Sequence, residues 1–302
     1  MQVDVVYTWV NDKDPKWIKM HEAESERLSS DIAWHRSVNS SARYSNRWEI
    51  FYSIRSLKKY ADWIDKIYIV TNCDVPKRIL DLGVVVPHED IFPDVNCLPS
   101  FNSRAIESCL HRIDGLSEYF LYLNDDVFFA SHSTIGDFYS NDGVVSVFPS
   151  KHDIKYDGNG LRPVDYGAIK AGLEIERRFN FRPVKKLHHA PFALRKSVLF
   201  EIEKNYGEEV EVTRLNKFKQ KDDFPLATTF FAYYAIATDF GCEKSCSCRY
   251  IDIGDVKCFA LLTYIFFRLK RYQFICLNEV FPMKFFSKIR DLYLSVFMRL
   301  YF

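Results

Sequence analysis

A run of apolar and aromatic residues interrupted by two adjacent carboxylates is the feature that most constrains this chain. Residues 119–129 read Tyr-Phe-Leu-Tyr-Leu-Asn-Asp-Asp-Val-Phe-Phe. The apolar run predicts a buried strand, which then meets Asn124, Asp125 and Asp126, polar groups that a buried strand cannot easily hide. In open parallel sheets, ligands bind at the carboxyl ends of the strands. Paired carboxylates at that edge suit a hard divalent cation, and such a cation suits a phosphate-bearing substrate. A turn whose Asn and Asp side chains cap a helix explains the same residues without any function.

A helix is predicted just before this strand. Apolar residues recur at helical spacing within residues 98–113, and Asn102 or Ser103 can cap the first turn. Glu107 and His111 are four residues apart, so they share the opposite face of that helix. Because the helix leads directly into the strand, we expect Glu107 to lie near the two carboxylates. A solvated Glu107–His111 pair is the alternative interpretation.

Apolar strands alternate with helical patterns along the rest of the chain. We expect strands over residues 3–10, 66–71 and 84–86 and a strand that begins at Tyr119, and helices over residues 49–60, 98–113, 198–206 and 226–240. Strands that alternate with helices form a mainly parallel sheet with helices packed against it. The sequence therefore predicts an α/β fold.

The overall charge argues against one class of partner. The formal net charge is +1 over 302 residues, which gives no global electrostatic case for binding nucleic acid. The start of the sequence lacks the charged and apolar segments of a secretory signal, so we expect a cytoplasmic protein. No run approaches the roughly 20 apolar residues of a membrane-spanning helix.

The cysteines give a weaker signal. Free thiols are the default state in the cytoplasm, and most of the eight cysteines stand singly. Cys242, Cys246 and Cys248 are close enough to suggest zinc, but no second Cys or His pair of the usual spacing follows them. A zinc site is therefore the less favoured interpretation of this cluster.

Several separate blocks of the sequence follow the order of the signature regions of one known family. The blocks are residues 4–15, then residues 43–49, 52–57, 67–72, 88–92 and 98–129, then residues 189–196 with 219–223, and finally residues 274–279. They resemble, in that order, the first, second, third and fourth regions of the Stealth proteins. Four ordered blocks over nearly the whole chain make this resemblance specific.

The resemblance implies a fold and a reaction. It implies a nucleotide-sugar-binding, glycosyltransferase-A-like sheet over residues 1–280, and a C-terminal helix over residues 281–302 lies beyond the last block. Members of the family include bacterial capsule phosphotransferases and the catalytic part of the animal lysosomal-enzyme N-acetylglucosamine-1-phosphotransferase. The implied reaction transfers a hexose 1-phosphate from a UDP-sugar, typically a UDP-N-acetylhexosamine, to a hydroxyl of a polysaccharide or lipid-linked oligosaccharide. UMP leaves, and the product is a phosphodiester used in capsular or exopolysaccharide synthesis.

The resemblance also implies roles for individual residues. Asp4, Glu107 and Asp126 match active-site carboxylates of the family, and His189 matches its active-site histidine. His189 is the best candidate for the general base, because the pKa of a histidine lies near the working pH; a structural loop is the alternative. Mg²⁺ or Mn²⁺ held by Asp126, Asp125 and Asp4 would bridge the pyrophosphate oxygens.

Further candidate ligands come from the second, third and fourth blocks. Asn46, Glu49 and Arg55 match positions of the second region, and Arg55 is a candidate phosphate ligand whose alternative is a helix-surface salt bridge. Lys219 stands where members usually have arginine, so the charge is kept but the planar fork for phosphate is lost. Glu279 stands where members usually have aspartate, and its carboxylate can still bind a metal or orient a base.

Three functions remain open on the sequence. Hexose-1-phosphate transfer is the leading hypothesis. A metal-dependent glycosyltransferase that forms a glycosidic bond is the second, because the same fold and paired acids serve both reactions. A non-catalytic derivative of the family is the third; the altered positions 219 and 279 favour it slightly, and the retention of Asp4, Glu107, Asp126 and His189 argues against it.

The segment over residues 282–302 has the pattern of a basic amphipathic helix. Pro282 can begin a helix, and apolar side chains recur at three- and four-residue steps from Phe285 to Leu300. The basic side chains outnumber the single acid Asp291; they are Lys284, Lys288, Arg290 and Arg299. Such a helix suits peripheral contact with the anionic inner face of the plasma membrane. A helix that packs on the domain and completes its core is an equally favoured interpretation.

Overall fold

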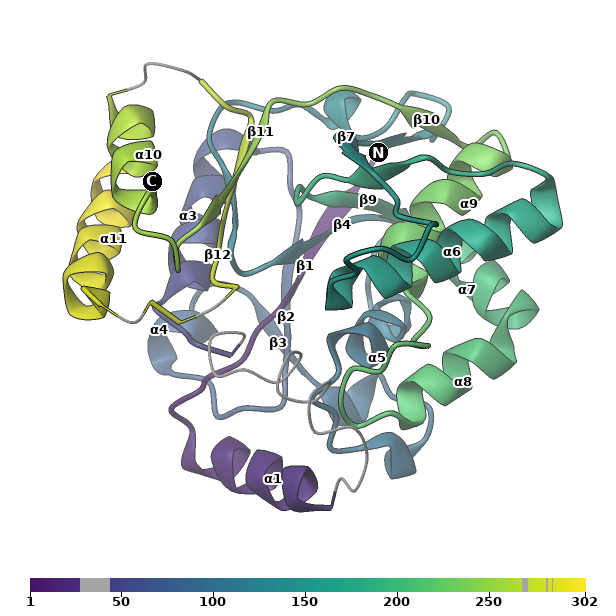
Figure 1. The fold of residues 1–302 in the computed structure, drawn as a ribbon, viewed down its shortest axis with the longest axis horizontal. Helices are drawn as coiled ribbons and strands as arrows, with labels where there is room; N and C mark the ends of the chain where they lie inside the picture. The colour runs from purple at the N-terminus through teal and green to yellow at the C-terminus, as the bar shows by residue number, and fades with distance from the viewer. Residues whose placement is uncertain (28–43, 268–270, 281, 284) are drawn as a thin grey trace.

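A five-stranded sheet lies at the centre of the computed structural model, which describes residues 1–27, 44–267, 271–280, 282–283 and 285–302. The strand order is β3-β2-β1-β4-β9, and only β9 runs antiparallel to its neighbour (Figure 1). The strands are β1 (Val3–Thr8), β2 (Ile67–Thr71), β3 (Val84–Pro87), β4 (Tyr119–Asn124) and β9 (Phe192–Arg195). The predicted α/β fold with a mainly parallel sheet is confirmed. Arg43 and Lys284, which belong to segments named above, lie outside the described residues.

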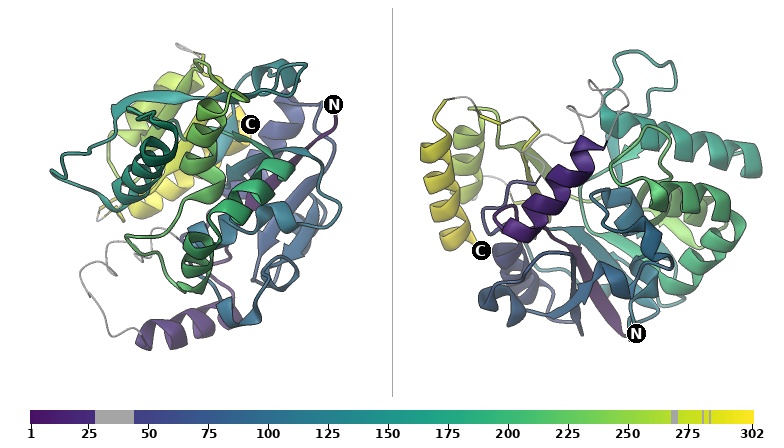
Figure 2. Two further views of the ribbon diagram at one scale, coloured as in Figure 1. Left: turned by 90° about the vertical axis from the view of Figure 1, so that its right-hand side faces the viewer. Right: turned by 90° about the horizontal axis from the view of Figure 1, so that it is seen from below.

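Helices pack on both faces of this sheet, as the two views in Figure 2 show. The helix α3 (Glu49–Tyr60) covers the face of Tyr7, whose hydroxyl lies 3.0 Å from Ser53 Oγ. The helix α5 (Ser103–Glu107) covers the opposite face, where the Tyr122 hydroxyl reaches Glu107. The other helices are α1 (Pro15–Glu26), α4 (Lys77–Leu80), α6 (Pro163–Phe179), α7 (Lys196–Asn205), α8 (Gly207–Leu215), α9 (Phe231–Ala237), α10 (Cys258–Phe266) and α11 (Ser287–Tyr301).

The chain leaves the central sheet at the two carboxylates. As the sequence predicted, the strand β4 ends where it meets the polar residues: Asp125 and Asp126 form a turn, and β5 (Val127–Phe129) then joins a second sheet in the order β11-β12-β5. After the turn, Phe129 packs in the main core and Phe128 packs in a second hydrophobic cluster. The other strands outside the central sheet are β6 (Val145–Val147), β7 (Pro149–Asp153), β8 (Lys185–Leu187), β10 (Gly241–Glu243), β11 (Cys248–Asp252) and β12 (Phe274–Asn278).

The C-terminal segment completes the second cluster. Leu294, Phe297, Met298 and Phe302 are buried in it, and the Phe302 ring stacks 4.6 Å from the ring of Phe128. The interpretation of this segment as part of the core is therefore confirmed for one face of α11. The helix begins at Ser287 rather than at Pro282, because the preceding residue has a left-handed backbone with φ 63°.

The helix expected over residues 98–113 is shorter than predicted. The Asn102 side chain caps it as expected, accepting from Arg104 N over 3.1 Å, but regular α-helix ends at Glu107. The Ser108 carbonyl, which a longer helix would use internally, accepts instead from the Arg214 guanidinium over 2.6 Å. Glu107 and His111 therefore do not share a helix face, and the expected pair between them is absent.

His111 pairs with Glu203 instead. His111 is fully buried, and its Nε2 donates to a carboxylate oxygen of Glu203 over 2.7 Å. Arg112 donates to the same carboxylate over 2.8 Å, and Arg214 contacts it as well. Burial opposes ionisation of Glu203, but these three donors prevail and hold the pKa of its carboxyl below the usual range. The cluster joins α7 and α8 to the segment that follows α5.

We predict that Glu203→Gln lowers the free energy of unfolding at pH 7 by about 3 kcal/mol, because the guanidinium groups of Arg112 and Arg214 lose their common anion and the buried His111 N–H loses its acceptor. Urea denaturation of the variant and of a control, Glu208→Gln on the exposed surface of α8, measures the difference. The stabilising contribution is complete above about pH 4.3, the ordinary glutamate pKa, and disappears as pH falls through the lower folded-state pKa. Equal stability of variant and wild type at pH 7 contradicts the prediction.

Candidate active site

The turn between β4 and β5 places the two predicted carboxylates at the carboxyl edge of the central strands. Asp125 and Asp126 follow Asn124, the last residue of β4, and both keep partial contact with solvent. The Asn278 side chain, at the end of β12, donates from Nδ2 to Asp126 Oδ2 over 2.8 Å. Asp126 Oδ1 is buried and has no hydrogen-bond partner among the described residues. One oxygen of Asp126 is thus oriented by the protein, and the other is available to a ligand.

A third acid adds to the negative charge of this turn. Glu49, the first residue of α3, is buried, and the desolvation raises the pKa of its carboxyl. Burial also raises the pKa of Asp125 well above its usual range, and the nearby charges of Asp126 and Glu49 raise it further. The pKa of Asp126 is likewise raised, chiefly by burial. Carboxylates that repel one another in a largely buried position offer oxygen ligands whose charge a divalent cation would neutralise.

No complete metal cage accompanies this pair. Within the described ranges, no group of three or more His, Cys, Asp or Glu side chains is arranged to hold a metal ion. Cys242, Cys246 and Cys248 are free thiols. Mg²⁺ commonly takes one or two protein carboxylates and completes its coordination with water and substrate phosphates. Asp125 and the unpaired oxygen of Asp126 fit that mode of binding.

His189 lies in the loop that leads into β9. It is beside Asp125 and Asp126, the turn that we call the acid turn. Its ring is exposed to solvent on one side, and the ring of Tyr250 packs against it with centroids 5.0 Å apart. Desolvation by the surrounding protein lowers the pKa of His189, while the neighbouring Asp126 carboxylate opposes that shift. A neutral imidazole that is accessible and close to an acid pair can accept a proton from a substrate hydroxyl.

Glu107 and Lys219 lie at the same edge, on the α5 side. The Tyr122 hydroxyl is 3.2 Å from Glu107 Oε1 and 2.8 Å from Asn124 Oδ1, so it connects Glu107 to the start of the acid turn. Burial raises the pKa of Glu107, and the positive charges of Lys219 and Arg104 oppose the shift. The structure therefore brings a buried acid and a lysine side chain to this part of the site.

Asp4 lies at the opposite end of the sheet. It is paired in register with Phe120, four residues before Asn124, which places it about 13 Å along the strand from the acid turn. Its buried carboxylate accepts from the backbone amides of Lys66, over 3.1 Å, and Ser117, over 2.8 Å. The expected convergence of Asp4 with Asp126 is wrong, because Asp4 stands near the beginning of its strand and Asp126 follows the end of the neighbouring one.

Arg55 also lies away from the acid turn. It occupies the exposed side of α3, whereas the buried side of the helix carries Ser53 and Ser56. Six residues separate it from Glu49, which corresponds to about 9 Å along the helix axis. Its expected contact with a phosphate is not supported, because its side of the helix faces solvent and not the acid turn.

Asn46 and Arg47 organise the entrance of α3. Asn46 Oδ1 accepts from Trp48 N over 2.8 Å, which is a structural role and not a ligand contact. The Arg47 guanidinium contacts Glu279 and lies 3.6 Å from a carboxylate oxygen of Glu49. These contacts hold the first turn of α3, and with it Glu49, close to the acid turn.

Glu279 is held by two guanidinium groups. Besides Arg47, the buried Arg290 of α11 contacts the Glu279 carboxylate. Both arginines also reach Asp291, each over 2.8 Å. The expected role of Glu279 as a metal ligand or base-orienting group is replaced by a structural one, because both of its oxygens face arginines. The ion-pair cluster connects the C-terminal helix to the start of α3.

Sequence reasoning missed Asn278 and Tyr250. The Asn278 amide donates to Asp126 while its Oδ1 accepts from the Tyr250 hydroxyl over 3.1 Å, and this pair of contacts fixes the amide orientation. Asn278 ends an apolar strand just as Asn124 does, so the pattern that indicated the acid turn could have indicated it too. No local pattern distinguishes Tyr250, which contacts His189 only through the tertiary structure.

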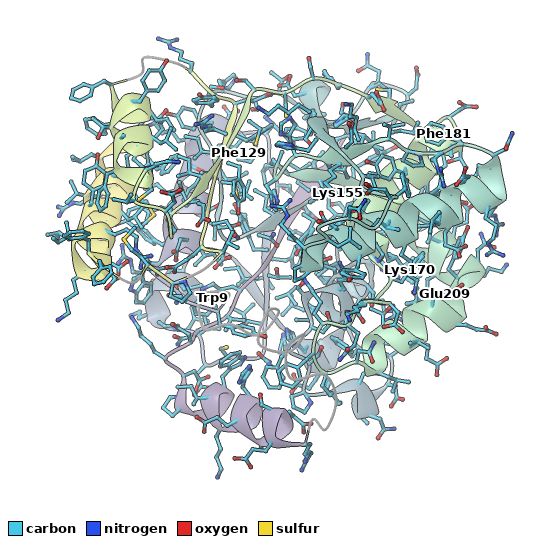
Figure 3. The ribbon with its side chains drawn as sticks, viewed as in Figure 1. Trp9, Phe129, Lys155, Lys170, Phe181 and Glu209 are labelled. Atoms are coloured by element: carbon cyan, nitrogen blue, oxygen red, sulfur yellow. The ribbon has the colours of Figure 1, made fainter. Side chains whose placement is uncertain are left out.

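Three more side chains that follow β1 and β2 each have one buried polar atom without a hydrogen-bond partner among the described residues. Trp9 Nε1, Asp12 Oδ1 and Asn72 Nδ2 are buried atoms without a hydrogen bond among the described residues. Trp9 directly follows β1, and its backbone amide bonds to Val70 O over 3.0 Å. In the view of Figure 3, the labelled residues Trp9 and Phe129 lie between the C-terminal helices α10 and α11 and the strands of the central sheet. These buried donors and this acceptor lie near the carboxyl ends of β1 and β2, the edge of the sheet that also carries the acid turn.

We predict opposite stability effects for two of the aspartates, measured in EDTA at pH 7. Asp4→Asn should lower the free energy of unfolding by about 1 kcal/mol, because one of two backbone amides loses its acceptor. Asp125→Asn should raise it by about 1 kcal/mol, because the substitution removes the charge repulsion with Asp126 and Glu49. This gain should shrink as pH falls through the raised folded-state pKa of Asp125, because the wild-type carboxyl is then protonated and its repulsion is lost. A loss of stability in Asp125→Asn contradicts our account of the acid turn.

Comparison with solved structures identifies similar folds at low sequence identity. Mouse xyloside xylosyltransferase 1 aligns over 92% of this chain and 98% of its own, with 9% identity and a TM-score of 0.43. The galactosyltransferase LgtC aligns over 91% of this chain and 86% of its own, with 9% identity and a TM-score of 0.44.

Sequence comparison gives closer relatives. An exopolysaccharide phosphotransferase of Streptomyces coelicolor is 36% identical over 282 residues, which is 92% of this chain and 47% of the relative. A capsular polysaccharide phosphotransferase of Aeromonas hydrophila is 32% identical over 83% of this chain and 70% of its own length. A capsular polysaccharide phosphotransferase of Haemophilus influenzae is 34% identical over 76% of this chain and 64% of its own. The chain spans about half the length, or less, of the Streptomyces relatives it matches.

Family comparison confirms the resemblance seen in the sequence blocks. Stealth conserved region 1 matches residues 1–29, conserved region 2 matches residues 43–147, and conserved region 3 matches residues 188–236. The acid turn, Glu107, His189 and Lys219 all fall within the matched regions. With these three regions in order, and with relatives above 30% identity over most of its length, the chain belongs to the Stealth family of proteins.

Proposed function

We propose that this protein transfers a hexose 1-phosphate, in particular an N-acetylhexosamine 1-phosphate, from a UDP-sugar to a sugar hydroxyl. UMP is released and a phosphodiester forms, in the synthesis of capsular polysaccharide or exopolysaccharide. Membership of the Stealth family and the printed names of its relatives support sugar-phosphate transfer in polysaccharide synthesis. The UDP donor and the N-acetylhexosamine rest on the resemblance alone.

The observation that carries the proposal is the position of His189 beside Asp126 at the carboxyl edge of the sheet. The acceptor hydroxyl attacks the β-phosphorus, its proton passes to the imidazole, and the bond from that phosphorus to the bridging oxygen breaks to release UMP. The lowered pKa of His189 keeps the imidazole neutral at pH 7 and ready to accept the proton. Tyr250 and Asn278 position the base and the acid, respectively.

A Mg²⁺ or Mn²⁺ ion would be held by Asp125 and by the unpaired oxygen of Asp126. It would supply charge neutralisation at the pyrophosphate and assist departure of UMP. Asp4 is not among its ligands, because the Asp4 carboxylate lies at the other end of the sheet. Lys219 adds a positive charge on the Glu107 side, where the sugar phosphate would also be stabilised.

The donor and acceptor would enter from different sides of the acid turn. Trp9, Asp12 and Asn72 offer unsatisfied polar atoms at the ends of β1 and β2, which suit the hydroxyl and carbonyl groups of a nucleoside. The acceptor is a polysaccharide or a lipid-linked oligosaccharide, met in the cytoplasm or at the inner face of the plasma membrane. No helix in the described part of the chain is both long and apolar enough to cross a bilayer.

One experiment separates this proposal from its alternatives. The protein is incubated with UDP-N-acetylhexosamines, Mg²⁺ and capsule oligosaccharides, and the released nucleotide is identified. Release of UMP that depends on the acceptor supports phosphotransfer, and release of UDP supports a glycosyltransferase that forms a glycosidic bond. Release of neither nucleotide across a panel of UDP-sugars, together with tight nucleotide binding, supports the non-catalytic derivative.

We predict that turnover requires a divalent cation. Removal of metal with EDTA should abolish release of UMP, and Mg²⁺ or Mn²⁺ should restore it, because the acid turn and the pyrophosphate are both negatively charged and a divalent cation would neutralise both. The assay is repeated on protein shown by elemental analysis to be free of metal. Full turnover by that metal-free protein sinks the metal proposal.

We further predict that His189→Ala and Asp126→Asn each lower kcat at least about a hundredfold, the low end for removal of an acid–base group. His188→Ala, the half-buried neighbouring histidine, and Asp142→Asn, on an exposed turn, serve as matched controls and should retain activity. In the wild type, the acid limb of the pH–rate profile should fall below pH 6.5, in line with the lowered pKa of His189. Near-wild-type kcat in either site variant removes that residue from the mechanism.

A further inference from the structure

The C-terminal helix carries a second apolar stripe that nothing in the described structure covers. One side of α11 is buried against the three-stranded sheet through Leu294, Phe297 and Met298. On the side turned away from the sheet, apolar residues recur at steps of three and four, and Leu292 is 68% exposed. The stripe consists of Ile289, Leu292, Val296 and Leu300, and the preceding residues Phe285 and Phe286 extend it. A helix that only completed a core would need the buried side alone.

The neighbouring helix continues this surface. α10 packs beside α11, and the hydroxyls of Thr263 and Tyr293 lie 2.6 Å apart across the contact. Tyr264 and Phe266 of α10 are exposed, and Phe267, which follows the helix, is 68% exposed. In Figure 1 the two helices lie side by side as the outer wall of the molecule at the C-terminal end. We call the exposed apolar residues of the two helices, from Tyr264 to Phe267 and from Phe285 to Leu300, the outer face.

Basic side chains border the outer face. Lys288 and Arg299 are exposed on α11 and lie on the same flank of its apolar stripe, because they are eleven residues apart. The one acid on the helix, Asp291, is already engaged by Arg47 and Arg290. Lys257, at the start of α10, and Arg271 are further exposed cations in this region. The border of the outer face therefore presents positive charge to whatever covers it.

The outer face is rigidly attached to the domain. Arg290 is buried and bonded to Glu279, and Phe297, Tyr301 and Phe302 pack against one another in the second cluster. The other side of α11 is therefore packed on the domain, and the exposed apolar residues are not a core-facing side that has detached from it. An aromatic surface that is attached to the domain and has a cationic border combines the two features that bind peripheral proteins to anionic bilayers.

We propose that the outer face of α10 and α11 docks on the surface of an anionic lipid bilayer. The aromatic and aliphatic side chains enter the headgroup region, and Lys288 and Arg299 contact lipid phosphates. A lipid surface fits better than a second copy of the chain, because two such faces would bring their cationic borders together. The proposal does not depend on the reaction that the acid turn catalyses, and neither result of the nucleotide assay changes it.

Vesicle sedimentation with the full chain tests the proposal. Wild-type protein should sediment with vesicles of phosphatidylcholine that contain phosphatidylglycerol, and more weakly with phosphatidylcholine alone. Phe285→Ser combined with Leu292→Ser should reduce partition at least about tenfold, because two exposed apolar side chains are lost. Leu80→Ser combined with Val95→Ser removes two exposed apolar residues elsewhere and should leave partition unchanged.

A double charge-reversal variant measures the electrostatic contribution to vesicle binding separately from the apolar contribution. Lys288→Glu combined with Arg299→Glu should reduce partition to anionic vesicles at least about tenfold, since each cation near such a surface contributes about a fivefold factor. Lys151→Glu combined with Lys204→Glu changes the net charge equally on other exposed surfaces and should have little effect. Thermal unfolding followed by circular dichroism checks that all four variants remain folded.

Several outcomes would overturn the proposal. The proposal is refuted if wild-type protein does not sediment with anionic vesicles. It is also refuted if the outer-face variants sediment with them as the wild type does. Light scattering is run in parallel at the same protein concentrations. A dimer that becomes monomeric in Phe285→Ser/Leu292→Ser, without vesicle binding by the wild type, would identify a second copy of the chain as the occupant.

Discussion

Mutual repulsion among acids at the carboxyl edge of the sheet is the constraint on which the site depends. Asp125, Asp126 and Glu49 are brought together by a turn and by the first residue of a helix, in surroundings that raise the pKa of each. A protein that needed only stability would not place three carboxylates there. The arrangement fits the cation and the pyrophosphate that we propose, and the buried oxygen of Asp126 that has no partner among the described residues is the ligand we propose for the cation.

A compensating group of ion pairs lies immediately behind these acids. Arg47 and Arg290 hold Glu279 and Asp291 between them, and Arg47 also faces Glu49. Because Arg290 belongs to α11, the position of an acid beside the acid turn depends on a helix more than 200 residues further along the chain. The same helix buries one side in the second cluster and exposes an apolar stripe on the other, so the core and membrane interpretations of the C-terminal segment are compatible.

Which site residues can be anticipated depends on where they stand in their strands. Asp125 and Asp126 interrupt an apolar run, and in a parallel sheet such an interruption must lie at an edge. Asp4 carries the same chemical group, but it stands near the start of its strand, and the strand direction sends it to the other edge. Two acids that match the same family motifs thus lie at opposite edges of the sheet, and only the register between strands shows this.

The sequence by itself determined the α/β class, the bounds of α3, the position of the acid turn and the Stealth membership, because periodicity and local motifs are properties of neighbouring residues. Only the tertiary structure decided that β5 leaves the central sheet, that His111 pairs with Glu203, and that Asn278 and Tyr250 orient the site. These contacts join residues separated by roughly 30 to 150 positions. No local pattern encodes such a contact, since it arises from the way the sheets and helices pack together.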